Sequence, residues 1–191
     1  MLPLPKGDDA VVCFVGIDPG TTKPGLCLLY YDMSSRQIVK IIARVLTLDK
    51  FSRDSPYSNY QNEKFLRLRA LDSILRDVLR TERPVRVASE VPFINIKRPG
   101  AVIPLAECLN VVENCVFDYN PYMPLDKFAP SLVKKAVHAR TNSNDKNEMT
   151  LAILEIPELA NNVVGRLRHM DNNAVDSIAV AYAAFKLEFP S

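Results

Sequence analysis

The stretch that decides the fold is VVCFVGIDPGTTKPGLCLLYYD, residues 11–32. Its first eight residues form a continuous apolar run that ends at Asp18, and the Asp-Pro-Gly sequence that follows favours a turn. A second apolar run covers 24–32, and after an Asp-Met-Ser-Ser turn a third covers 37–48. Strands joined by such short turns predict an antiparallel meander.

Helical and extended patterns alternate through the rest of the chain. Apolar residues recur at helical spacing after a polar loop, which predicts an amphipathic helix. The predicted elements are a loop over 51–60, helices over 61–81, 105–117 and 171–185, further helices beginning at Ser131 and after the polar start of 142–155, a strand over 85–91 and a short extended piece over 123–128. This order predicts an α/β fold: a mixed five-stranded sheet, three antiparallel strands and then two further strands, with helices on both faces.

The composition is typical of one soluble globular domain. The 191 residues are 48% hydrophobic and 24% charged, with a net charge of +2, which excludes a disordered, collagen-like or coiled-coil chain. We expect a single domain over 1–191 with a loose segment at 1–10. No apolar run approaches the ~18 residues of a membrane span, and the N-terminus resembles neither a signal nor a transit peptide. We therefore expect a cytoplasmic protein, bacterial or from a phage-infected host, with no membrane partner.

The cysteines and histidines favour no transition-metal site. Cys13, Cys27, Cys108 and Cys115 lie in apolar segments without metal-binding spacing, so we expect buried, reduced thiols. With only two histidines in the chain, a His-rich metal site is excluded.

Three acids stand where structure alone would not place them. Asp18 and Glu90 each end an apolar strand, and Asp176 lies among apolar residues of the last helix. A charged acid in such surroundings is costly unless it is paired or bound to a metal. If the two strands are neighbours, the acids converge and suit Mg²⁺ or Mn²⁺, which prefer oxygen ligands. Taken singly, Asp18 is equally explained as a turn residue and Asp176 as a solvated helix position.

Five pieces of the sequence resemble the RuvC family of Holliday-junction resolvases. They are GIDPGTT (16–22), SEVPF (89–93), LVKKAV (132–137), DKNEM (145–149) and DSIAVAYAAF (176–185), and they occur in the family's order. The resemblance covers about Val11 to Phe185. It implies an RNase H-like fold and a structure-selective endodeoxyribonuclease that resolves four-way junctions by paired symmetric nicks, with two divalent ions per active site.

The resemblance also implies site residues. Asp18, Glu90 and Asp176 become metal-binding catalytic acids, and Lys146, less directly Lys134, becomes a basic group near the scissile phosphate. Phe93 matches an aromatic position near the junction centre, with an ordinary strand-end residue as the alternative.

One position departs from the family pattern. The family usually carries an acid three residues before the last one, where this chain has Asn173, while Asp171 lies five before. We expect Asp171 to be the fourth acid, provided that it lies on the incoming loop or caps the helix. Asn173 as a ligand, a three-acid site and an Asp-to-Asn change stay open.

Basic residues flank each predicted catalytic element. This placement favours a surface that follows DNA phosphates. The candidates are Lys97, Arg98, Lys134, Lys135, His138, Arg140, Arg166, Arg168 and His169. A four-way junction has approximate two-fold symmetry, so two cuts imply a C2 homodimer. Helix 105–117 is apolar on more than one face, so it is either a core helix or one that also contacts a partner.

Three other functions fit parts of the pattern. The same acids would serve a nuclease on RNA–DNA hybrids or other branched nucleic acids. Asn173 would fit a catalytically silent junction-binding protein. GIDPGTT also resembles the phosphate turn of actin-like ATPases, but those need two domains and a second such turn.

Overall fold

A five-stranded mixed sheet forms the centre of the computed structural model, which describes residues 10–91, 102–140 and 147–190. The strands are β1 (Val11–Asp18), β2 (Gly25–Asp32), β3 (Gln37–Val45), β4 (Arg86–Glu90) and β5 (Leu125–Phe128), in the order β3-β2-β1-β4-β5. The first three are antiparallel, and β4 runs parallel to both β1 and β5. The predicted sheet is confirmed, and β1 and β4 are neighbours.

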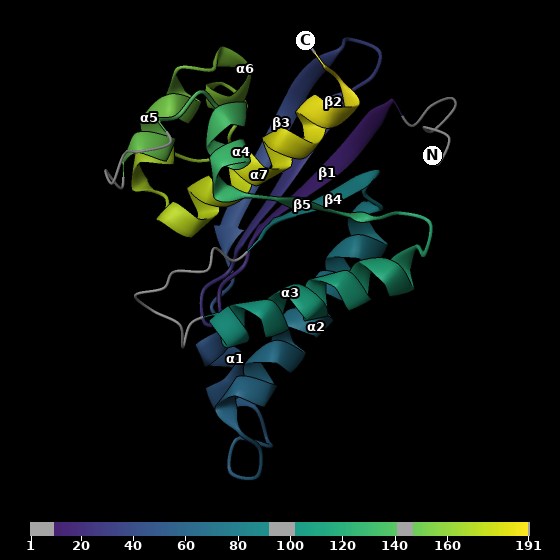
Figure 1. The fold of residues 1–191 in the computed structure, drawn as a ribbon, viewed down its shortest axis with the longest axis vertical. Helices are drawn as coiled ribbons and strands as arrows, with labels where there is room; N and C mark the ends of the chain where they lie inside the picture. Colours follow the sequence, from purple (N-terminus) through teal and green to yellow (C-terminus); the bar gives the residue numbers. More distant parts are fainter. Residues whose placement is uncertain (1–9, 92–101, 141–146, 191) are drawn as a thin grey trace.

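Helices cover both faces of the sheet (Figure 1). On one face lie α1 (Leu48–Asp54), α2 (Glu63–Glu82) and α3 (Val102–Tyr119). On the other lie α4 (Pro130–Ala136), α5 (Glu148–Leu154), α6 (Pro157–Ala160) and the long α7 (Asn172–Glu188), preceded by a 3-10 helix at Leu167–His169. Each face therefore has its own apolar core.

The alternation of side chains along β1 decides which core each residue enters. Val12 and Phe14 belong to the core beneath α7, whereas Cys13, Val15 and Ile17 belong to the core beneath α2 and α3. Because successive strand residues face opposite sides, Asp18 falls on the α7 side.

Two glycines let α7 lie directly on the β1–β2 hairpin. A Cβ atom on Gly16 would come within 2.3 Å of the Ala181 backbone nitrogen, and one on Gly25 within 1.8 Å of the Asn173 carbonyl oxygen. No other residue type fits at either position without moving the helix. The glycines thus set the height of α7 above the strand that carries Asp18.

The predicted loop over 51–60 is partly wrong, because α1 continues to Asp54. The polar sequence of this stretch gave no sign that α1 is held by contacts with the rest of the fold. Within α1, Leu48 and Ser52 are buried, and Asp49 pairs with Arg67 of α2 at 2.9 Å. The third strand also ends at Val45 rather than at residue 48, since the backbone amides of 46 and 48 donate instead to carbonyls of the β1–β2 turn. For α1, packing against α2 outweighs the low helix propensity of its polar residues.

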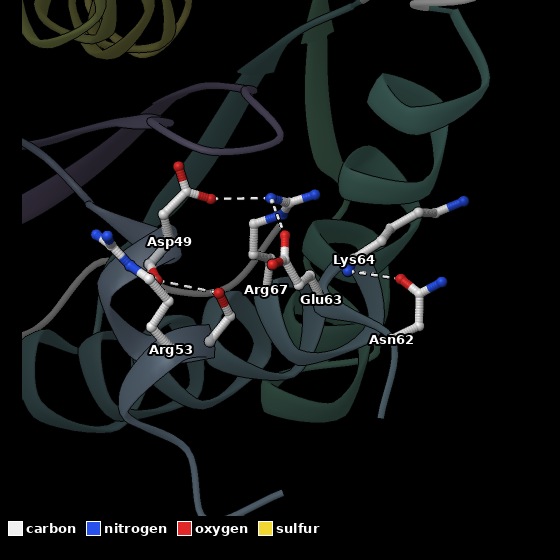
Figure 2. A network of polar contacts seen from close by, with 7 residues as sticks. Asp49, Arg53, Asn62, Glu63, Lys64 and Arg67 are labelled. Carbon is white, nitrogen blue, oxygen red and sulfur yellow. Dashed lines mark hydrogen bonds and ion pairs between the residues drawn. The ribbon is translucent and has the colours of Figure 1, made fainter. Parts of the chain in front are cut away.

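A polar network ties α1 to α2, as Figure 2 shows. The Arg67 guanidinium lies between the carboxylates of Asp49, at 2.9 Å, and Glu63, at 3.7 Å. Asn62 caps α2 by accepting a hydrogen bond from the Lys64 backbone amide at 2.8 Å. This network orients the helix pair whose inner face packs on the sheet.

All four cysteines are free and buried, as predicted. Burial, with a contribution from Glu82, raises the pKa of the Cys13 thiol to about 12, so it stays protonated. Among the described residues, the helices are all too short or too polar to cross a membrane.

Candidate active site

Asp18 and Glu90 end two adjacent parallel strands. The β1–β4 register pairs Gly16 with Ala88 and Ile17 with Ser89, and one further step places Asp18 beside Glu90. Ala88 belongs to the core beneath α7, so Glu90, two residues on, shares that side with Asp18. Both carboxyl groups are half-buried at the carboxyl ends of their strands.

The N-terminal part of α7 supplies two more acids. Asp176 is half-buried between Val175 and Ser177, which are both buried. Asp171 is the N-cap of the helix, where its Oδ1 accepts a hydrogen bond from the Asn173 backbone amide at 3.1 Å. The capping position on which its predicted role depended is therefore observed.

The acids raise one another's pKa values. Burial raises the pKa of Asp18 to about 8, and repulsion from Asp176, Glu90 and Asp171 adds to it. Burial and then Asp176 raise the pKa of Glu90 to about 7. The pKa of Asp176 rises to about 6, first through burial and also through Asp171. The sequence-predicted acids thus share one electrostatic environment, and ionising all of them without a cation is costly.

Lys134 supplies a positive charge that acts on two of these acids. It lies on α4, which packs against α7. Its positive charge lowers the pKa of both Glu90 and Asp176, against the effect of burial. The structure therefore brings Lys134 together with the acids.

The turn after Asp18, residues 19–24, accepts hydrogen bonds from three separate parts of the chain. The sequence did not predict these contacts. The carbonyl oxygens of the turn at Thr22 and Pro24 accept hydrogen bonds at 2.9 Å from the backbone amides of Leu48 and Leu46. The remaining two donors are the Cys108 thiol, 3.7 Å from the Gly20 oxygen, and the Asn173 side-chain amide, 2.6 Å from the Lys23 oxygen. No local sequence signal marks these contacts, because the donors are distant in the chain.

The donor set fits hard divalent cations. Carboxylate oxygens are the ligands that Mg²⁺ and Mn²⁺ prefer, and a cation would offset the repulsion that raises these pKa values. Within the described ranges, no group of three or more His, Cys, Asp or Glu side chains is placed so that it could hold a metal ion. The fit therefore rests on the chemistry and burial of the acids.

The predicted DNA-binding residues lie partly within the described ranges. Lys135, His138 and Arg140 are exposed on α4 and just after it, and Arg168 is exposed in the 3-10 helix that leads to α7. Arg168 also lines an open pocket with Arg166 and His169. The predictions for Phe93, Lys97, Arg98 and Lys146 concern residues outside the part of the chain that the structure describes.

Comparisons with known proteins bear on the fold. No protein-family model and no curated protein matches the chain. Among solved structures, Thermus thermophilus RuvC in complex with a Holliday junction substrate is 22% identical, with 94% of this chain and 96% of that chain covered and a TM-score of 0.65. A second T. thermophilus RuvC structure gives 22% identity, coverage of 93% and 95%, and a TM-score of 0.64. The yeast mitochondrial Holliday junction resolvase Ydc2 is 11% identical, with 88% and 75% covered and a TM-score of 0.58.

These likenesses extend over nearly the whole chain. They show that the chain has the RNase H-like fold of RuvC-type resolvases, as predicted from the motifs at 16–22, 89–93 and 176–185.

Proposed function

We propose that this protein is a divalent-metal-dependent endonuclease that resolves four-way DNA junctions by paired symmetric nicks. The observation that carries the proposal is the convergence of Asp18, Glu90, Asp171 and Asp176, whose charges couple at one end of the sheet. The RuvC-like fold supports it, since one similar structure holds a Holliday junction.

The four acids are the groups that would hold two Mg²⁺ or Mn²⁺ ions, with Asn173 as the alternative to Asp171. Ions held there would supply the activation of water and the stabilisation of the leaving oxygen that phosphodiester hydrolysis needs. Asp18, Glu90 and Asp176 are half-buried, so their charges would act more strongly on bound cations than charges in bulk water do, whereas Asp171 is exposed. Lys134 favours the ionised forms of Glu90 and Asp176. Lys146 would offset charge that develops on the phosphate.

Exposed basic groups on α4 and before α7 support DNA binding beside these acids. In the proposal, Lys134, Lys135, His138, Arg140 and Arg168 contact phosphates, together with Lys97, Arg98 and the aromatic Phe93. Such contacts make affinity fall steeply with salt. Two coordinated cuts require two sites, so we propose a C2 homodimer. The exposed Ile103 and Phe117 on α3 support a partner contact along that helix.

A substrate panel tests the proposal. Purified protein is incubated with a synthetic four-way junction, a linear duplex, a fork and an RNA–DNA hybrid, with Mg²⁺, Mn²⁺ or EDTA. We expect symmetric paired nicks in the junction that EDTA abolishes. Preferential cleavage of the hybrid would instead indicate a ribonuclease with the same acids. Tight junction binding without cleavage in either metal would indicate a silent binding protein.

A further inference from the structure

The side chain of Asn173 contacts the turn that follows Asp18. Its Nδ2 lies 2.6 Å from the Lys23 carbonyl oxygen, across 150 residues of sequence. A carbonyl oxygen only accepts hydrogen bonds, so the amide group must turn its nitrogen, not its oxygen, toward the turn. The contact thus needs a donor at position 173, which an ionised carboxylate does not offer.

The backbone of Asn173 also touches the hairpin at the level of Asp18. In the β1–β2 register Asp18 pairs with Gly25. A Cβ on Gly25 would lie 1.8 Å from the Asn173 carbonyl oxygen, so only glycine permits this approach. The first turn of α7 is therefore fixed to the hairpin through both the backbone and the side chain of one residue.

We propose that Asn173 is a positioning residue that clamps the turn after Asp18 to α7, rather than a metal ligand in place of Asp171. This inference rests on the proposed metal-dependent function and specifies how its site is built.

Asp171 and Asn173 have different roles because one is charged and the other is neutral. Asp171 keeps one oxygen on the Asn173 backbone amide, and its charge acts on both Asp18 and Asp176. Asn173 is uncharged and its amide donor is engaged by Lys23. Because Asp176 and Asn173 share α7, the clamp couples the helix that carries one acid to the hairpin that carries another. Loss of the clamp lets Asp18 move relative to Asp176.

Matched variants test whether Asn173 clamps the turn or binds the metal. Asn173→Ala removes the donor, Asn173→Asp replaces it with a carboxyl group, and Asp171→Asn removes a charge while keeping a good helix cap. The exposed neighbour Asn172 provides the controls Asn172→Ala and Asn172→Asp. The readouts are amide hydrogen exchange over 19–25 in metal-free protein, Mn²⁺ affinity by calorimetry, and kcat and KM for junction cleavage.

For Asn173→Ala we expect at least ~5-fold faster exchange over 19–25, because opening of the turn loses a hydrogen bond. We also expect weaker Mn²⁺ binding and a lower kcat at unchanged KM. Above neutral pH, Asn173→Asp should show the same faster exchange as Asn173→Ala. In acid its exchange should slow again in part, because a protonated carboxyl group can donate a hydrogen bond. Asp171→Asn should lose Mn²⁺ affinity with unchanged exchange over 19–25, and the Asn172 controls should match wild type.

Two results would overturn the inference. One is Asn173→Asp binding Mn²⁺ more tightly or cutting faster than wild type, which would make position 173 a ligand site. The other is unchanged exchange and affinity in Asn173→Ala. A wild-type protein that binds Mn²⁺ and shows the expected exchange pattern but cuts no junction would support the clamp and refute the proposed function.

Discussion

The metal-free protein should lose stability as pH rises from about 4 to about 8, and Asp18→Asn should remove the largest part of that loss. Asp18 has its pKa raised from 3.8 to about 8, so folding favours its protonated form. Its contribution is fully present below the unfolded pKa and is lost as pH rises through the folded pKa. An asparagine has no charge to bury, so the variant escapes the loss.

The size of the effect follows from the raised pKa. At ~1.4 kcal/mol per pKa unit, a rise from 3.8 to about 8 corresponds to about 6 kcal/mol at high pH. This is a ceiling, because part of it is repulsion from Asp176, Glu90 and Asp171, which small movements relieve. We expect Asp18→Asn to gain at least about 2 kcal/mol near pH 8, or roughly 4–8 °C in Tm for a chain of this size.

The assay is thermal and urea unfolding followed by circular dichroism, with EDTA, near pH 5 and near pH 8. Asp77→Asn, at an exposed position of α2, is the matched control and should change neither curve. Mg²⁺ near pH 8 should raise the Tm of the wild type more than that of Asp18→Asn, since a ligand of the native state stabilises it. A variant that is no more stable than wild type near pH 8, or that is stabilised equally at both pH values, would show that ionisation of Asp18 does not destabilise the fold.

Three further variants test other parts of the structure. Gly16→Ala should cost about 2 kcal/mol or more in urea unfolding, because its new Cβ would meet the α7 backbone; wild-type stability would show that α7 adjusts freely. Lys134→Gln should move the acid limb of the cleavage pH profile upward, because it no longer lowers the pKa of two acids, while Lys135→Gln should not; an unmoved limb would exclude this role. Arg168→Gln should reduce the slope of log affinity against log salt by about one, and an unchanged slope would place this residue away from phosphate.

The sheet and the position of its acids could be predicted from sequence because their signals are local. The run ending at Asp18 and the run ending at Glu90 are each continuous, apolar and bounded by turn or proline residues. The two acids lie at the same end of the sheet if β1 and β4 are neighbours, and the structure confirms that they are.

What could not be predicted depends on contacts between distant segments. The polar sequence of α1 gave no helical signal, since its stability comes from burial of Leu48 and from Arg67. The contact from Asn173 to Lys23 joins residues that have no common pattern. Periodicity reports which face of an element is buried, not which donor reaches which carbonyl across the core.

We propose above that the acids at the ends of β1 and β4 and at the start of α7 form one metal-dependent cleavage site. The most direct test compares wild type with Asp18→Asn on a labelled four-way junction with Mg²⁺, measuring nicking and, in a parallel gel shift without cleavage, binding. We expect nicking by the wild type alone and junction binding by the variant that is equal or tighter, because the variant has one acid fewer to repel the phosphates. Nicking by purified Asp18→Asn at a rate near that of wild type would contradict it.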